Sequence, residues 1–115
     1  MYITVTSLRL RKLTGFFKLT LFGMKISRQA MKQPGFVKLR NRGFGYLHYT
    51  LTAWESKEAL KEFAHSGAHK DAMKQSKLLA TEIRTHTYES DQFPRWNQAI
   101  EALNNEGKVM MFGER

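Results

Sequence analysis

The chain has 115 residues, 42% of them hydrophobic, which suffices for one domain spanning residues 1–115 with a single modest core. It contains no cysteine, so disulfides and thiolate metal sites are excluded and a reducing, cytoplasmic location is expected. The formal net charge is +9, but its distribution is uneven, because the first 54 residues carry ten Lys or Arg and no acidic residue.

Hydrophobic periodicity predicts an alternation of strands and helices. In chain order, the predicted elements are a strand over 2–9, a helix from 13 to about 32, hairpin strands over 36–42 and 44–54, a helix between Ser56 and Gly67, a second helical segment from 69 to about 78, a strand over about 79–88 and a helix from 95 to about 105. Ser56 is suited to cap its helix and Gly67 to end it. The first helix is too short and too charged to cross a bilayer, and the start of the chain lacks a secretory-signal pattern, so no membrane partner is expected.

This order predicts an α+β domain of ferredoxin-like βαββαβ topology, with an antiparallel sheet, two long helices on one face and an extra C-terminal helix. Alternation in the third strand separates two sets of side chains. Leu47, Tyr49, Leu51 and Ala53 are expected beneath the helices; Tyr46, His48, Thr50, Thr52 and Trp54 are expected on the opposite face. That second face is semi-polar and aromatic, so we expect a second copy to cover it, giving a homodimer that encloses a small-molecule site.

Three parts of the chain resemble one known family. Thr50–Leu60, continued by Phe63, Ser66, His69 and Met73, resembles the antibiotic-biosynthesis-monooxygenase superfamily of dimeric α+β barrels, above all its spheroidene-monooxygenase-like members. Pro34–Phe36 and Phe93–Trp96 are similar to the same group's helix stop and tail. The resemblance implies a dimeric barrel whose relatives include cofactor-free oxygenases and haem-handling proteins.

Haem-degrading relatives hold haem with a tryptophan and a histidine, and Phe63 and Met73 occupy the matching positions here. Haem binding through His65 or His69 remains an alternative, and the cofactor is otherwise unknown, with none required for cofactor-free oxygenation. A metal site shared by His65 and His69 is opposed by Gly67, which is expected to break the helix between them.

The candidate site residues are those expected to line the enclosed face. His48 and His86 are candidate catalytic groups, because an imidazole can move a proton near neutral pH. The candidate substrate-binding residues are Trp54, Tyr46, Thr50, Thr52, Arg84 and His69. Each of these side chains could instead be an interface residue without a chemical role.

Two basic features leave alternatives open. Lys38, Arg40 and Arg42 share one side of the second strand, where cations either bind an anion or prevent edge-to-edge aggregation. Lysines recur every seventh residue of the first helix and mark its expected solvent face: Lys18, Lys25 and Lys32. Its aromatics are expected in the buried stripe, which does not favour nucleic-acid binding: Phe16, Phe17 and Phe22.

The leading functional hypothesis is therefore a small-molecule-binding dimeric barrel acting as a monooxygenase on an aromatic or polycyclic compound. The alternatives are a non-catalytic ligand-binding protein, a polyanion-binding protein and a haem-binding protein.

Overall fold

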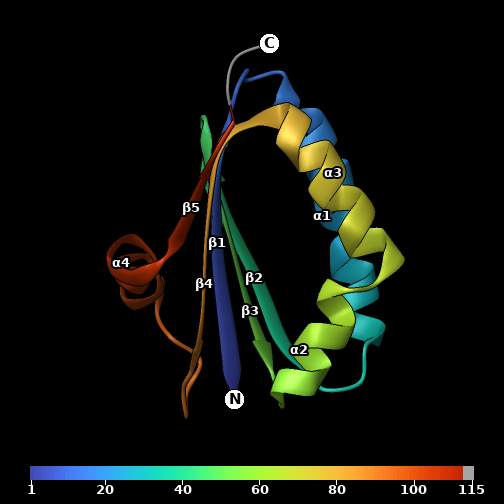
Figure 1. The fold of residues 1–115 in the computed structure, drawn as a ribbon, viewed down its shortest axis with the longest axis vertical. Helices are drawn as coiled ribbons and strands as arrows, with labels where there is room; N and C mark the ends of the chain where they lie inside the picture. Colours follow the sequence, from blue (N-terminus) through green and yellow to red (C-terminus); the bar gives the residue numbers. More distant parts are fainter. Residues whose placement is uncertain (113–115) are drawn as a thin grey trace.

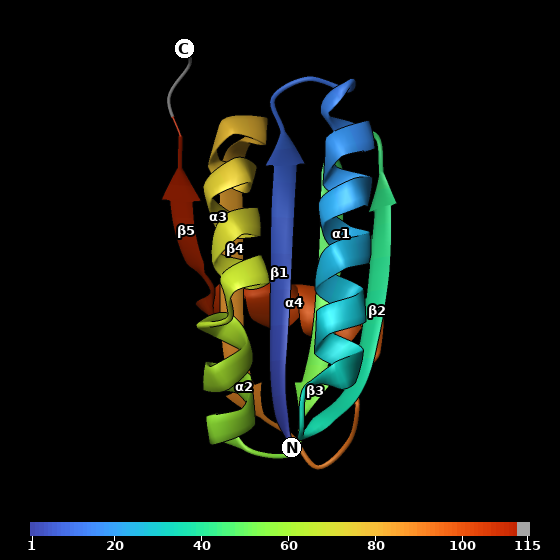
Figure 2. The same cartoon turned by 90° about the vertical axis from the view of Figure 1, so that its right-hand side faces the viewer.

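The computed structural model describes residues 1–112, which form a five-stranded antiparallel sheet with helices on both faces (Figure 1). The elements are β1 (Tyr2–Leu10), α1 (Gly15–Lys32), β2 (Phe36–Phe44), β3 (Leu47–Trp54), α2 (Lys57–Ala64), α3 (Gly67–Leu79), β4 (Ala80–Glu89), α4 (Trp96–Glu106) and β5 (Lys108–Met111). The sheet order is β2-β3-β1-β4-β5. Helices α1, α2 and α3 cover one face and α4 lies across the other (Figures 1 and 2). The predicted βαββαβ order is confirmed, and β5 is an addition that the sequence pattern did not predict.

Local signals explain where α2 and α3 begin. The Ser56 hydroxyl accepts a hydrogen bond from the Ala59 amide at 3.1 Å, which confirms the predicted cap of α2. Gly67 does not end that helix as predicted. It is the first residue of α3, because the Ser66 hydroxyl accepts a hydrogen bond from the His69 amide and caps a new helix.

The turn of the β2–β3 hairpin lies two residues later than predicted. Gly45, with a φ of 62°, adopts the left-handed conformation that the turn requires, whereas Gly43 lies within β2. A Cβ atom at Gly43 would overlap the imidazole of His48 on the neighbouring strand. Glycine is therefore required at position 43 by close approach rather than by a turn.

The sheet faces are the reverse of the predicted assignment. The residues were grouped correctly, because Thr52 pairs with Thr4 and His48 pairs with Leu8 on one shared face. That face, however, lies under the long helices of the same chain, where Trp54 packs with Ala30 of α1 and Phe63 of α2.

The opposite face is covered by α4. Buried apolar residues of β1 and β3 pack there against Ala99 and Leu103: Ile3, Val5, Leu51 and Ala53. The expectation that a second copy covers the threonine-bearing face was wrong, because the chain's own helices occupy that side. Helix α4 therefore buries the apolar residues that were predicted to lie beneath the long helices.

Helix α1 buries fewer aromatics than predicted. Its sheet-facing side is formed by Leu19, Ile26 and Ala30, whereas Phe16 and Phe17 are 47% and 73% exposed. The prediction that both phenylalanines lie in the buried stripe was wrong. It placed Lys18, Lys25 and Lys32 at the centre of the exposed side of the helix, whereas these lysines lie along one edge of that side. Within residues 1–112, no helix combines the length and apolarity needed to span a bilayer.

Candidate ligand-binding site

Three adjacent strands each carry a Thr-x-Thr sequence, and their register places all six threonines together. Residues 4–6 of β1 lie between residues 50–52 of β3 and residues 85–87 of β4. We call this surface the threonine band, and its members are Thr4, Thr6, Thr50, Thr52, Thr85 and Thr87. Because directly paired residues of antiparallel strands share a face, the six side chains form two rows on the face that carries the long helices.

The hydroxyls of the threonine band are partly paired with one another. Thr4 and Thr87 hydroxyls lie 2.9 Å apart, and those of Thr6 and Thr85 lie 3.3 Å apart. Thr50 donates to the side-chain oxygen of Asn41 at 3.2 Å. Each hydroxyl carries one donor and two acceptor positions, so this pairing leaves acceptor capacity for a ligand.

The threonine band lies between two apolar clusters that join helices to sheet. One cluster contains Leu8 and Leu19, and the other contains Trp54 and Ile26. Between them only Thr52 is buried, while the other threonines are half-buried or exposed. The apolar contacts that join helices to sheet therefore lie at both ends of the threonine band, and Figure 1 shows the helix layer running along this face of the sheet.

An aromatic chain of four side chains closes one end of the threonine band. Trp54 lies 5.6 Å from Phe36 and 4.8 Å from Phe63, and Phe63 lies 5.2 Å from His69. The indole Nε1 of Trp54 is buried and has no hydrogen-bond partner. A buried donor without an acceptor is uncommon in proteins and is satisfied when a water or ligand oxygen reaches it.

His69 is the titratable group beside this aromatic chain. Burial lowers the pKa of its imidazole, a smaller opposing effect comes from a hydrogen bond with the Ala64 backbone, and nearby His65 lowers the pKa slightly further. Because the ordinary value is about 6.5, His69 is neutral at pH 7 and can accept a proton.

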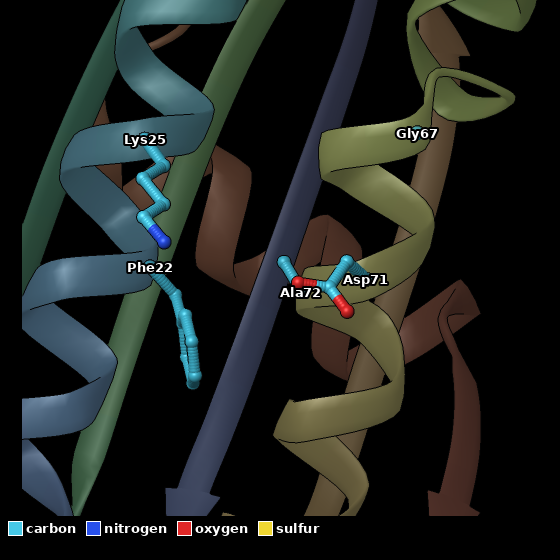
Figure 3. Close-up of a pocket in the computed structure, with 5 residues that line it drawn as sticks. All are labelled: Phe22, Lys25, Gly67, Asp71 and Ala72. Atoms are coloured by element: carbon cyan, nitrogen blue, oxygen red, sulfur yellow. The ribbon is translucent and has the colours of Figure 1, made fainter.

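A pocket of about 330 Å³ lies between α1 and α3. Its lining residues are Phe22, Lys25, Gly67, Asp71 and Ala72. Figure 3 shows Phe22 extending from α1 into the space between the two helices, with β1 running behind it. The helix layer is therefore open on its outer side, next to the middle of the strand that carries Thr4 and Thr6.

The predicted site residues divide between the two sheet faces. Trp54, Thr50 and Thr52 share the helix-covered face of the sheet, and His69 is connected to Trp54 through the ring of Phe63. His48 lies at the far end of the same face, where its ring is 5.5 Å from the Phe16 ring and Nε2 is 2.9 Å from the Gly45 carbonyl oxygen. His48 therefore contacts the backbone of the hairpin turn. Tyr46 lies in that turn and is 46% exposed.

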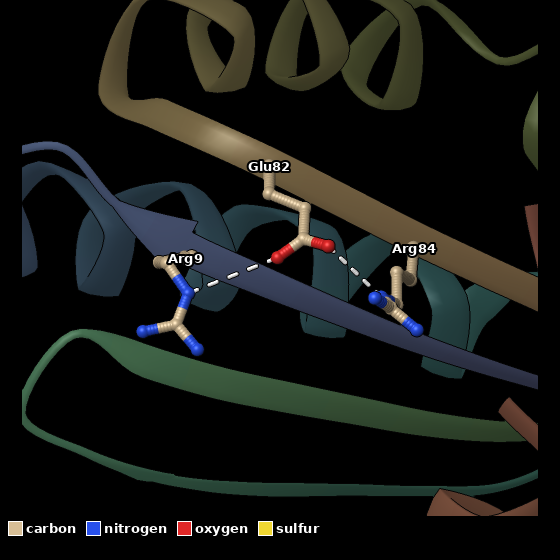
Figure 4. Close-up of polar contacts among 3 residues, drawn as sticks. All are labelled: Arg9, Glu82 and Arg84. Carbon is tan, nitrogen blue, oxygen red and sulfur yellow. Dashed lines mark hydrogen bonds and ion pairs between the residues drawn. The ribbon is translucent and has the colours of Figure 1, made fainter. Parts of the chain in front are cut away.

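His86 and Arg84 lie on the α4 face, away from Trp54 and His48. Arg84 donates to Glu82 at 2.9 Å, and Arg9 lies 3.7 Å from the other oxygen of that carboxylate (Figure 4). His86 stacks on Tyr88 with ring centres 5.3 Å apart, and its Nε2 is 3.3 Å from a Glu106 carboxylate oxygen. The expectation that these residues share one cavity with Trp54 was wrong, because Val5 and not Thr4 or Thr6 is the partner of His86.

The remaining candidate residues are the cations of β2 and the histidines His65 and His69. Lys38, Arg40 and Arg42 share the α4 face of β2, as predicted from their alternation. His65 follows α2 and its Nδ1 is 2.7 Å from the Lys61 carbonyl oxygen, while His69 belongs to α3. Among the described residues no cluster of three metal-ligating side chains occurs, and haem ligation by His65 or His69 stays a prediction.

Sequence reasoning missed Thr85, Thr87 and the pocket residue Phe22. The threonines had a detectable signal, because Thr-x-Thr appears in three predicted strands and all three pairs fall in register. Phe22 had no comparable signal, since its place between α1 and α3 depends on how the helices pack.

Comparison with solved structures finds the same fold in antibiotic biosynthesis monooxygenases. A protein of Nitrosomonas europaea provisionally named as one is 10% identical, with a TM-score of 0.72 over 80% of this chain and 100% of its own. A similarly named protein of Deinococcus radiodurans is 14% identical, with a TM-score of 0.73 over 83% of this chain and 97% of its own. SnoaB, a cofactor-independent oxygenase from Streptomyces nogalater, is 14% identical, with a TM-score of 0.65 over 79% of this chain and 93% of its own.

No protein-family model matches the sequence, and no curated protein matches it. At these identities the structural likeness establishes the fold alone. The predicted ferredoxin-like fold of the antibiotic biosynthesis monooxygenases is confirmed, whereas a nearer relationship to spheroidene-monooxygenase-like members stays a prediction.

Proposed function

We propose that this chain binds a flat, largely apolar small molecule over the threonine band and oxidises it as a cofactor-independent monooxygenase, with His69 as the base. The proposal rests on one combination of features. The threonine band lies on the helix-covered face between two apolar clusters, and burial lowers the pKa of His69 beside the aromatic chain at one end of the band. The fold shared with oxygenases such as SnoaB is consistent with this chemistry.

The proposed reaction requires only the substrate and dioxygen. His69 accepts a proton from an activated CH₂ group of a phenolic ring system, and the resulting anion is electron-rich enough to reduce dioxygen. One oxygen atom becomes a carbonyl of the product and the other leaves as water, so that R₂CH₂ + O₂ gives R₂C=O + H₂O. The substrate supplies all four electrons, and the reaction therefore needs no further reductant.

The surrounding residues have distinct proposed roles. Threonine hydroxyls orient the oxygen substituents of the ring system, and the unpaired indole N–H of Trp54 offers a donor to an oxygen that carries developing negative charge. Phe63 provides a flat apolar surface between Trp54 and His69. Apolar walls exclude water and favour reaction of the anion with dioxygen over its reprotonation.

The proposal is tested with dithranol, a tricyclic phenol that contains a reactive CH₂ group. Oxygen uptake and quinone absorbance are followed with wild-type protein, with His69→Gln and with His65→Gln. We expect oxygen uptake above the buffer rate for wild type and for His65→Gln, and a loss of about 10²-fold or more in His69→Gln, because general-base catalysis contributes that much. His65 is the matched control, since it is exposed and lies outside the aromatic chain.

Two results would contradict the catalytic proposal. One is wild-type oxygen uptake no faster than in buffer; the other is His69→Gln with wild-type rates. Quenching of tryptophan fluorescence by dithranol without oxygen uptake would identify a ligand-binding protein that is not an enzyme, whereas no quenching would also exclude this ligand class.

We also propose a homodimer, although not through the threonine band. The end of the α4 face that α4 leaves uncovered carries the Arg9–Glu82–Arg84 ion cluster, and Val109 and Met111 of β5 are 45% and 71% exposed. Exposed apolar side chains with paired charges at their border are suited to contact a second copy. Light scattering should give twice the monomer mass for wild type and a monomer for Val109→Glu/Met111→Glu; a wild-type monomer at micromolar concentration would refute the proposal.

A further inference from the structure

The outer side of α1 carries a ridge of large, exposed apolar side chains. Its members, which we call the α1 ridge, are Phe17, Leu21, Met24 and Met31, exposed by 73%, 60%, 49% and 62%. Their spacing of four, three and seven residues places them on one side of the helix. Because Leu19, Ile26 and Ala30 already attach α1 to the sheet, the α1 ridge is not needed to hold the helix in place.

Basic side chains border the α1 ridge throughout its length. Lys18, Lys25, Arg28 and Lys32 are all exposed, and α1 contains no acidic residue. Helix α3 lies beside α1 in the same layer (Figure 2) and adds three exposed lysines: Lys70, Lys74 and Lys77. The outer sides of α1 and α3 thus combine a line of large apolar side chains with seven cations and one exposed acid, Asp71. Helix α2 adds two exposed lysines and two exposed glutamates and so leaves this excess of positive charge unchanged.

We propose that this face binds the surface of an anionic lipid bilayer, with the α1 ridge inserted at the boundary between headgroups and acyl chains. A helix that combines Phe, Leu and Met on one side with flanking lysines is suited to lie in the plane of that interface. The apolar side chains enter the lipid, while the cations contact lipid phosphates. Surface binding of this kind does not require a spanning segment, so it agrees with the absence of one in residues 1–112.

The charge of this face favours an anionic bilayer over a second copy of the chain as its binding partner. Symmetric pairing of two α1 ridges would bring Lys18, Lys25 and Lys32 of both copies together, and such like-charge contacts oppose association. A nucleic acid would satisfy the cations, but phosphate contacts leave Phe17 and Leu21 unburied. An anionic bilayer satisfies both parts of the surface, and it lies on the opposite side of the molecule from the proposed dimer surface of the α4 face.

The test is sedimentation with large unilamellar vesicles made either of phosphatidylcholine alone or of equal parts phosphatidylcholine and phosphatidylglycerol. We expect the wild-type protein to sediment with the anionic vesicles, to bind neutral vesicles far more weakly, and to be released as salt is raised from about 0.05 M to about 0.5 M, because salt screens the lipid charge.

Two variants separate the apolar and the charged contributions. Phe17→Gln/Leu21→Gln should weaken binding by at least about tenfold, since it removes the inserted side chains. Lys18→Gln/Lys32→Gln should weaken it by about tenfold or more, since each cation near an anionic surface contributes several-fold. The matched control is Arg42→Gln/Phe44→Gln, which removes one exposed cation and one exposed aromatic from the β2–β3 hairpin and should bind like wild type.

Three results would overturn the proposal. The first is no sedimentation of wild-type protein with anionic vesicles at low salt. The second is Phe17→Gln/Leu21→Gln binding as tightly as wild type while remaining bound to heparin or DNA, which would indicate a general polyanion site. The third is a change of solution mass caused by the same variant without any change in lipid binding, which would assign the α1 ridge to a second copy. Circular dichroism confirms that each variant is folded, as expected for exposed positions.

Discussion

Replacing Leu103 by alanine tests whether α4 is part of the core. Leu103 is 0% exposed and packs on the sheet with Ile3, Val5 and Leu51. Truncating a fully buried leucine loses apolar burial and leaves a cavity, which costs 2–5 kcal/mol in typical cores, so we expect a loss of about 3 kcal/mol in the free energy of unfolding. Urea denaturation followed by circular dichroism measures it.

The matched control is Leu78→Ala in α3, because Leu78 is 57% exposed and should cost only about 0.5 kcal/mol. If Leu103→Ala cost no more than Leu78→Ala, α4 would not cover the sheet in solution. The apolar face of β1 and β3 would then be free to bind a second copy, whereas Trp54 would still lie beneath α1 and α2.

Three further changes test the ligand-binding face. Burial lowers the pKa of His69, so below about pH 6.5 the unfolded chain binds more protons at this residue than the folded chain does. Wild type should therefore lose stability as pH falls towards 5, and His69→Gln should lose less. Melting temperatures at pH 7.5 and 5 compare the two proteins. Gly43→Ala should destabilise by about 1–3 kcal/mol and should be rescued in part by His48→Ala, as a double-mutant cycle in urea would show. Thr6→Val/Thr85→Val removes both partners of one hydroxyl pair, so stability should change by less than about 1 kcal/mol while dithranol quenching weakens; unchanged quenching would argue against ligand contact with the threonine band.

The sequence sufficed for the element order and for the grouping of side chains, because both depend on local periodicity. Alternation in β3 correctly separated Thr50, Thr52 and Trp54 from Leu51 and Ala53. It could not say which group faces the long helices, since that depends on where α4 packs after a loop of six residues between Glu89 and Trp96. A surface rich in hydroxyls was assigned to a dimer interface, whereas it lies beneath the chain's own helices, between the two apolar clusters that join them to the sheet.

The candidate site was predictable in part for the same reason. Trp54 and the threonines of β3 were identified from their shared face, and His69 from its place in the resemblance to the monooxygenase family. His86 was misplaced because residues 84 and 86 of β4 alternate with the threonines and so point to the α4 side. β5 was missed because four residues are too few to show a strand period.

The strand order has a consequence for how the chain folds during synthesis. β1 precedes the other described elements along the chain, yet it occupies the centre of the sheet, and the residues it pairs with begin 38 positions after Arg9 at Leu47 and extend to Glu89. Contacts this distant along the chain slow folding, because a long loop must close before they form. During synthesis, β1 therefore has no strand partner until β3 is made, and Ile3 and Val5 lack their apolar cover until Ala99 and Leu103 of α4 follow. This interval is when assistance by chaperones would matter most.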